Sequence, residues 1–128
     1  MFNEVAFSGY SVLDQNEARQ FYEDILGLIV DDSQMGLELR FESGHSVFLY
    51  PKIDHEPAAY TVLNFPVDDI DEAMGLLLDR GIEFEFYDDL PSEQDENGVL
   101  RGKQTGHGPD IAWFKDPSGN ILAICARV

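Results

Sequence analysis

The spacing of apolar residues predicts a strand, a helix and three more strands in the first half of the chain. Alternation over 5–13 is typical of a strand, and the apolar residues of 16–26 recur every three or four positions, as on one face of a helix. Three short apolar runs then predict strands at 28–31, 36–42 and 46–50, separated by polar or glycine-containing turns. This order defines one βαβββ module.

The second half of the chain repeats this order. Strand-like segments at 60–67, 82–87, 110–115 and 121–126 accompany a helix that begins after residue 69. Asp14 and Asp69, 55 residues apart, are each followed three positions later by Glu, a pair typical of a helix N-terminus. Gly27 and Gly81, 54 residues apart, suit the left-handed cap that ends a helix. The chain therefore predicts a tandem βαβββ duplication.

The domain organisation follows from the duplication. A chain of 128 residues is long enough for a single domain, 1–128, with module one over about 1–53, a linker over about 54–59 and module two over about 60–128. Most of the extra length of the second module falls in 88–109. The acidic run 92–98 inside this stretch predicts a solvated, mobile segment, and a loop of such length is also a candidate lid.

Three motifs resemble those of one superfamily. They are a helix bearing Phe21-Tyr22 and ending in Leu26-Gly27, a helix start at 67–73 reading Val-Asp-Asp-Ile-Asp-Glu-Ala, and a closing turn, Asp116-Pro117-Ser118-Gly119-Asn120. Together they resemble the vicinal oxygen chelate superfamily of glyoxalases, bleomycin-resistance proteins and ring-cleaving dioxygenases. The resemblance implies an α+β fold in which tandem βαβββ modules form a curved mixed sheet, shaped as a cup around a pocket. It also implies a homodimer.

The resemblance also indicates where a metal ion would bind. Metal-dependent relatives take one ligand, usually His or Glu, from each of four strands. The matching positions here are Phe7, Val62, Ala123 and Phe48, with Leu49 as the alternative to Phe48. None of these side chains offers the oxygen or nitrogen atom that a divalent ion needs. We therefore expect no metal at this site, and no cofactor.

The three histidines supply no evident replacement for the missing ligands. His45, beside the Ser43-Gly44 turn, and His55, in the linker, are expected at the surface. His107 stands between glycines in the long loop. Because loops held by a rigid scaffold often carry function, His107 is a candidate ligand contact.

Strand alternation adds further residues to the candidate pocket, because side chains two positions apart share one face of a sheet. The polar residues that alternation adds are Ser11, Asn64 and Cys125. Trp113 and Phe114 are neighbours on one predicted strand, so either one faces the pocket, where an aromatic ring could stack on a flat ligand, or both belong to the core. The ligand-binding candidates are Phe7, Ser11, Phe48, Val62, Asn64, His107, Trp113, Ala123 and Cys125.

Charge restricts the partners of this chain. It carries 25 acidic and 8 basic side chains, a formal net charge of −17. Such a surface repels phosphate backbones and anionic lipids, so neither nucleic acid nor a membrane is expected as a partner. It either keeps the protein in solution or attracts a cationic ligand. A single cysteine and the lack of a secretory signal fit a cytoplasmic protein.

These observations favour a metal-independent protein that binds a small, partly apolar or aromatic molecule in the sheet cavity, as in bleomycin-resistance-like sequestration or sensing. One alternative is a metal-independent lyase or isomerase whose acid–base residues the sequence does not locate. Another is a metal-dependent lyase or dioxygenase with relocated ligands. The sequence leaves open whether the protein is an enzyme, and it names no ligand.

Overall fold

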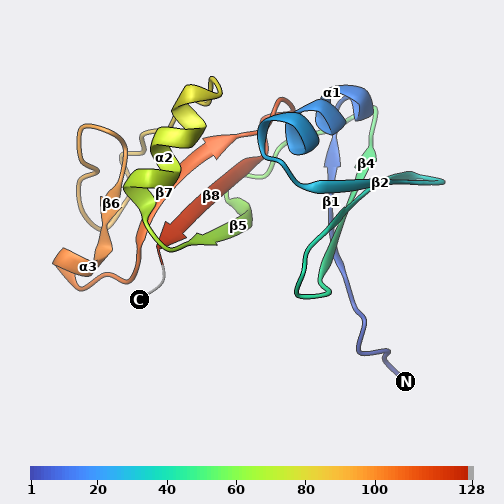
Figure 1. The fold of residues 1–128 in the computed structure, drawn as a ribbon, viewed down its shortest axis with the longest axis horizontal. Helices are drawn as coiled ribbons and strands as arrows, with labels where there is room; N and C mark the ends of the chain where they lie inside the picture. Colours follow the sequence, from blue (N-terminus) through green and yellow to red (C-terminus); the bar gives the residue numbers. More distant parts are fainter. Residues whose placement is uncertain (127–128) are drawn as a thin grey trace. The chain divides into compact units, whose positions relative to one another are not determined.

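The computed structural model describes residues 1–126, and its contacts divide the chain into two compact units (Figure 1). The first unit is Met1–Pro57 with Pro117–Gly119, and the second is Ala58–Asp116 with the stretch that begins at Asn120. The division after Pro57 falls inside the predicted linker. The three central residues of the closing turn, Pro117–Gly119, therefore belong to the first unit, while Asp116 and Asn120 on either side belong to the second.

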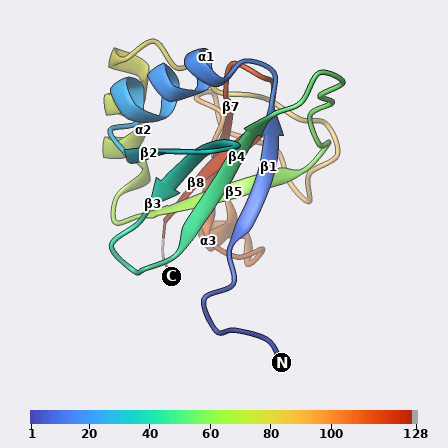
Figure 2. The ribbon, with the colours of Figure 1, turned by 90° about the vertical axis from the view of Figure 1, so that its right-hand side faces the viewer.

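The first unit is a four-stranded mixed sheet with one helical segment. The strand order is β1-β4-β3-β2, with β1 parallel to β4 and the other neighbours antiparallel (Figure 2). Its elements are β1 (Ser8–Val12), α1 (Gln15–Arg19), η1 (Gln20–Ile25), β2 (Ile29–Ser33), β3 (Gly36–Arg40) and β4 (Ser46–Pro51). This is the predicted βαβββ order.

The helical segment of this unit changes its winding midway. Asp14 caps α1 by accepting a hydrogen bond from the Glu17 N–H at 2.9 Å, as the sequence predicts. From Gln20 onward the segment is a π-helix instead of the expected continuous α-helix. The wider turn buries the adjacent side chains Phe21 and Tyr22 together, with their rings edge to face at 5.1 Å. The core of the unit also contains the buried residues Val12, Ala18, Leu37, Leu39, Val47 and Leu49.

The second unit repeats the same topology. Its strand order is β5-β8-β7-β6, with β5 parallel to β8. Helix α2 packs against β8, and Asp69 caps it by accepting from the Glu72 N–H (Figure 1). The elements are β5 (Thr61–Val67), α2 (Ile70–Asp79), β6 (Leu100–Arg101), α3 (Gly102–Thr105), β7 (Asp110–Lys115) and β8 (Ile121–Ala126). The predicted α+β fold with a repeated βαβββ order is confirmed.

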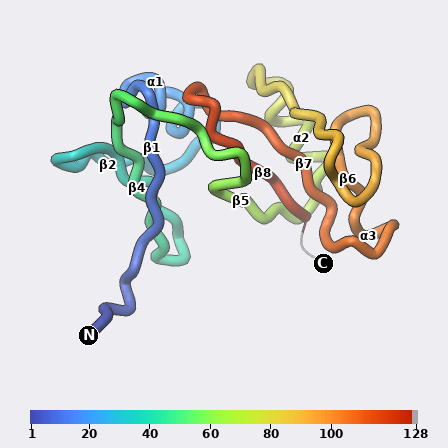
Figure 3. Tube along the Cα trace, turned by 180° about the vertical axis from the view of Figure 1, so that it is seen from behind, coloured from blue at the N-terminus to red at the C-terminus, as the bar shows by residue number. Residues whose placement is uncertain are grey.

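The outer edge of the second sheet differs from the prediction. The expected strand at 82–87 pairs with β7 through an isolated bridge, Phe84 with Phe114, and a hydrogen bond from the Glu85 N–H to the Trp113 carbonyl. Pairing with β7 resumes at β6, where Leu100 lies opposite Ile111. Between these two contacts the chain leaves the edge in a wide loop over 86–99 (Figure 3). The edge strand is therefore split, because this loop takes its backbone hydrogen bonds elsewhere.

Candidate functional site

One face of the second sheet carries a small apolar cluster. Trp113 on β7, Ala123 on β8 and Leu100 on β6 are buried together. Trp113 is the register partner of Ala123, which in turn lies opposite Asn64 on β5. Because side chains alternate along a strand, Phe114 turns to the other face, where it packs edge to face on Phe84 at 5.9 Å. Of the two neighbouring aromatics, Trp113 therefore faces this cluster.

A cavity of about 240 Å³ opens beside this cluster. Two aromatic rings form its corner, because Tyr87 meets Trp113 edge to face, with ring centroids 5.7 Å apart and planes at 86°. The indole Nε1–H of Trp113 donates to Thr61 Oγ1 at 3.0 Å, which fixes the ring. The lining residues are Ala59, Tyr60, Thr61, Tyr87, Asp89, Leu90, Trp113 and Ile121. This arrangement can hold a small flat molecule against aromatic surfaces.

Most of these lining residues were not among the sequence candidates. Thr61 was missed because the register of β5 shifts between Thr61 and Leu63, so simple alternation from Val62 does not hold there. Tyr87 was assigned to a regular strand, whereas it begins the loop that leaves the sheet edge. A signal for Tyr87 did exist, since aromatic residues on neighbouring strands often pair.

The loop that supplies Tyr87 is tied down by the side chain of Gln94. Its Oε1 accepts a hydrogen bond from the Tyr87 N–H at 2.7 Å, and its Nε2 donates to the carbonyls of Glu85 at 2.9 Å and Gly98 at 2.7 Å. The sequence predicted a mobile, solvated segment here. In the structure, this one amide side chain satisfies three backbone groups that would otherwise need sheet partners or water.

An ionic network fixes the far end of the same loop. Asp95 Oδ1 accepts from the Val99 and Asn97 N–H groups, and its Oδ2 accepts from Arg101 Nε at 3.1 Å. Arg101 also bonds Asp71 at 2.7 Å, at the start of α2. Burial by itself would raise the pKa of Asp95, but these hydrogen bonds and the guanidinium charge lower it below its ordinary value. The Asp95 side chain that holds this end of the loop is therefore ionised at neutral pH.

Three of the sequence candidates lie in the first unit, on the sheet face opposite its core. The ring of Phe7 meets Phe48 edge to face at 6.5 Å, and Phe48 stacks on Tyr50 at 5.9 Å. Ser11 shares this face by alternation along β1. Phe7 is 65% exposed, so this aromatic face is largely uncovered within its own unit.

Ser11 belongs to a hydrogen-bonded chain with a histidine. Its Oγ lies 2.6 Å from His55 Nδ1, and His55 Nε2 lies 2.9 Å from the carbonyl oxygen of Ser118. Because a carbonyl can only accept, Nε2 carries a proton, and when the ring holds only that proton Nδ1 accepts a hydrogen bond from the Ser11 hydroxyl. His55 was expected at the surface; it is part-exposed, and its imidazole connects the linker to β1 and to the closing turn.

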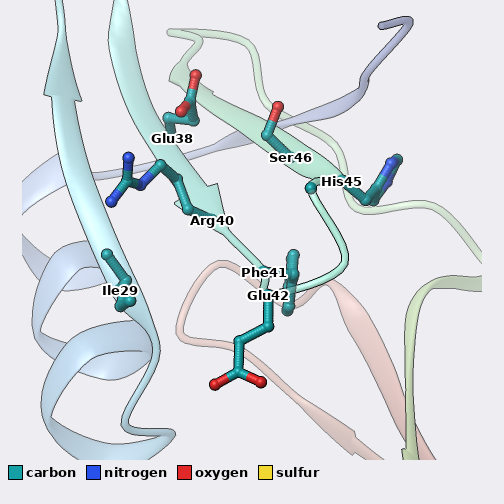
Figure 4. Close-up of a pocket in the computed structure, with 8 residues that line it drawn as sticks. Ile29, Glu38, Arg40, Phe41, Glu42, His45 and Ser46 are labelled. Carbon is teal, nitrogen blue, oxygen red and sulfur yellow. The ribbon is translucent and has the colours of Figure 1, made fainter.

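A second cavity of about 380 Å³ lies beside the β3–β4 hairpin of the first unit (Figure 4). It is lined by Ile29, Glu38, Arg40, Phe41, Glu42, Gly44, His45 and Ser46. Arg40 Nε is paired with Asp31 at 2.8 Å, and the labelled side chains of Glu38, Glu42 and His45 point in different directions (Figure 4). Without convergent polar groups, this cavity does not define a ligand position.

The remaining candidates lie apart from the Trp113 cavity lining. His107 is exposed after α3, where its N–H donates to the Gly102 carbonyl. Cys125 is half-buried opposite Ile111, and Asn64 is exposed beside Ala123. Val62 is half-buried at the register shift of β5.

The residues at the family's metal-ligand positions do not fit a divalent ion. Phe7, Phe48 and Val62 are apolar, and Ala123 is fully buried within the Trp113 cluster. Borderline and hard divalent ions need imidazole, carboxylate or thiolate groups. Elsewhere in residues 1–126, no group of three or more His, Cys, Asp or Glu side chains is arranged to hold a metal ion.

Comparison with known proteins identifies the family. The sequence profile of the Glyoxalase/Bleomycin resistance protein/Dioxygenase superfamily matches residues 3–124. The chain therefore belongs to this superfamily, as its three motifs indicated. A search of curated proteins found no match. In residues 1–126, none of the helices has the length and apolar character needed to cross a membrane.

Solved structures show the same fold at low sequence identity. The fosfomycin resistance protein FosX of Listeria monocytogenes matches with a TM-score of 0.68 and 14% identity, covering 100% of this chain and 96% of that one. TnmS3, an antibiotic binding protein of a Streptomyces species, matches at 0.65 and 20%, covering 100% of both chains. A glyoxalase family protein of Enterococcus faecalis matches at 0.67 and 20%, covering 97% and 98%.

Proposed function

We propose that this protein binds a small, partly apolar or aromatic molecule without a metal ion, to sequester or sense it. The observation that carries the proposal is the aromatic corner of Trp113 and Tyr87, which opens onto a cavity of about 240 Å³. Leu90 and Ile121 extend the apolar wall, while Thr61 already uses its hydroxyl to hold the indole. Cavities of this kind bind ligands mainly by apolar contact.

The residues at the metal-ligand positions support a metal-independent role. Phe7, Val62, Phe48 and Ala123 carry no ligand atom for an ion. The names of two structural relatives, a fosfomycin resistance protein and an antibiotic binding protein, are consistent with a protein that captures small toxic molecules. We also propose a cationic or neutral ligand, because Asp89 lines the cavity and the net charge is −17.

The single tryptophan of the chain gives a direct test. A flat aromatic ligand that enters the cavity must change the emission of Trp113, so a panel of neutral and cationic aromatic compounds can be titrated while fluorescence is recorded. Isothermal titration with Trp113→Leu should show weaker binding, because the aromatic wall is gone. His107→Ala, outside the cavity lining, serves as the matched control. Binding that is equal in wild type and Trp113→Leu would contradict the proposal.

A second candidate function is metal-independent acid–base catalysis, favoured by the Ser11–His55 pair. The Ser118 carbonyl orients the His55 ring, and Nδ1 lies within hydrogen-bond distance of the Ser11 hydroxyl, the arrangement in which a singly protonated imidazole can act as a general base. Turnover of glyoxalase-type or ester substrates in the presence of EDTA should then depend on pH. That activity should be lost in both Ser11→Ala and His55→Gln. Activity that survives in either variant would contradict this role.

A further inference from the structure

The cavity beside Trp113 combines aromatic walls with negative charge. Tyr87 and Trp113 meet at 86°, so their ring planes form two perpendicular walls, and Tyr60, which is 71% exposed, adds a third aromatic side chain to the lining. Asp89 is the one charged residue among those that line the cavity. This lining differs from that of an ordinary apolar pocket, because aromatic rings and a carboxylate both attract positive charge.

The two rings of the corner present aromatic surface and not polar atoms. The indole Nε1–H of Trp113 already donates to Thr61 Oγ1, and the hydroxyl oxygen of Tyr87 is buried, out of reach of a ligand. What Trp113 and Tyr87 offer a ligand is therefore their π-systems. The face of an aromatic ring carries partial negative charge and attracts a cation that lies within about 6 Å of the ring centroid.

The carboxylate of Asp89 is exposed, and its charge acts on the same corner. Burial is the main reason that the pKa of Tyr87 is raised, and the charges of Glu85 and Asp89 raise it further. Lys115, whose charge has the opposite effect on Tyr87, is paired with Glu85 at 3.2 Å. Asp89 therefore lies close enough to the Tyr87 ring to serve as the counter-charge of a cation bound there.

The loop that borders the cavity adds to this negative potential. Residues 86–99 contain no basic side chain, and their acidic side chains are Asp88, Asp89, Glu93, Asp95 and Glu96. Arg101 is paired with Asp95 alone among these, which leaves the loop with a net negative charge. An anion is repelled from a cavity in this position, and a cation is drawn toward it.

We infer that the Trp113 cavity recognises an alkylated ammonium group, as in a tertiary or quaternary amine, with Asp89 as its counter-charge. An ammonium group with several N–H bonds needs an acceptor for each of them, whereas N-alkyl groups need none. N-alkyl groups instead make apolar contacts with Leu90 and Ile121 while the positive charge lies against the aromatic rings. This inference rests on the proposed binding function and specifies the chemical class of its ligand.

Three benzyl compounds separate the effect of charge from that of shape. Benzyltrimethylammonium carries a quaternary nitrogen, neopentylbenzene has the same shape without charge, and benzylamine is a primary ammonium ion at neutral pH. Each is titrated into the full chain while binding is measured by calorimetry and by Trp113 emission. The quaternary compound is expected to bind about tenfold more tightly than the hydrocarbon, as contact of a cation with aromatic rings allows, and also more tightly than benzylamine.

Two pairs of variants assign this preference to the cavity. Asp89→Asn, at an exposed position, should lower the preference for the quaternary compound over the hydrocarbon by about threefold. Asp88→Asn removes the same charge from a neighbour outside this cavity lining, and the preference should stay close to that of wild type. Tyr60→Leu should also lower the preference, because an aromatic face is lost while apolar area is kept, whereas Tyr60→Phe should retain it.

The outcomes separate this inference from the function on which it rests. Equal affinity for the quaternary compound and the hydrocarbon overturns the ammonium assignment but leaves aromatic binding standing, and tighter binding of benzylamine overturns the requirement for alkylation. An equal loss in Asp88→Asn and Asp89→Asn shows that overall charge attracts the cation, which also overturns the site. A preference that persists in both Asp89→Asn and Tyr60→Leu places the cation elsewhere. If none of the three compounds binds, both the function and the inference are overturned.

Discussion

The indole of Trp113 on β7 donates its Nε1–H to Thr61 Oγ1 on β5 at 3.0 Å, although these two strands are not neighbours. Strand β8 lies between them, and Ala123 is the register partner of Trp113. The indole therefore reaches across β8 on the face that carries Ala123. In metal-dependent relatives, a metal ligand is expected at the position of Ala123. Here Ala123 is buried in the same apolar cluster as the Trp113 ring.

Replacing Thr61 should loosen the indole. In Thr61→Val the Nε1–H loses its acceptor, and we expect a loss of about 1 kcal/mol in the free energy of unfolding. Urea unfolding followed by circular dichroism measures this loss, and the Trp113 emission should shift as the ring gains water contact. Thr61→Ser retains the hydroxyl and should stay close to wild type. A Thr61→Val protein as stable as wild type would show that the bond does not hold the ring.

A carboxylate at position 123 should not restore a metal site. Ala123 is fully buried beside Trp113 and Leu100, so Ala123→Glu places a charge in an apolar cluster and should cost about 3 kcal/mol or more. Ala59→Glu, at an exposed position, should change stability by about 0.5 kcal/mol or less. Stoichiometric metal uptake by Ala123→Glu, measured after dialysis, would contradict this prediction.

We expect the side-chain amide of Gln94 to contribute most to holding the 86–99 loop in its conformation. Gln94→Ala removes hydrogen bonds to three backbone groups and should cost about 2 kcal/mol in unfolding free energy. The loop should also become the first site of limited proteolysis. The neighbouring exposed variant Glu93→Ala is the control, and its cleavage rate should match that of wild type. Equal protection in Gln94→Ala would show that the loop is held by other contacts.

Asp95 should contribute stability that disappears in acid. Its pKa is lowered in the folded protein from the ordinary value of 3.8, so its contribution is present above pH 3.8 and is lost as pH falls through the folded value. Asp95→Asn should therefore be less stable than wild type by about 1 kcal/mol at neutral pH, since the pair with Arg101 is partly exposed. The difference should vanish in strong acid. A pH-independent difference between the two proteins in denaturant titrations would contradict this assignment.

The homodimer expected of this family remains a prediction, and the first unit offers a surface for testing it. Phe7 is 65% exposed and its ring contacts Phe48 on the sheet face opposite the core of this unit. If that face lies in a dimer interface, Phe7→Asp should convert a dimer to a monomer in light scattering. Ile53→Asp, at a fully exposed apolar position, is the control. A wild-type protein that is monomeric at high concentration would exclude the dimer.

The sequence by itself determined the repeated βαβββ order, because apolar residues recur every three or four positions in a helix and every second position in a strand. It also determined the helix starts at Asp14 and Asp69, since a cap depends on neighbours three positions away. The family followed from three local motifs. The apolar identity of Phe7 and Ala123 argued against a metal ion without any coordinates.

Only the tertiary structure decided which side chains meet. The pairing of Ser11 with His55 joins residues 44 positions apart, and no local pattern marks it. The split edge of the second sheet arose because Gln94 binds backbone groups that a regular strand would have paired. The sequence likewise could not predict that the buried Tyr87 hydroxyl lacks a hydrogen-bond partner. Whether a buried group finds a partner depends on all the atoms that the fold brings near it, including those far away along the chain.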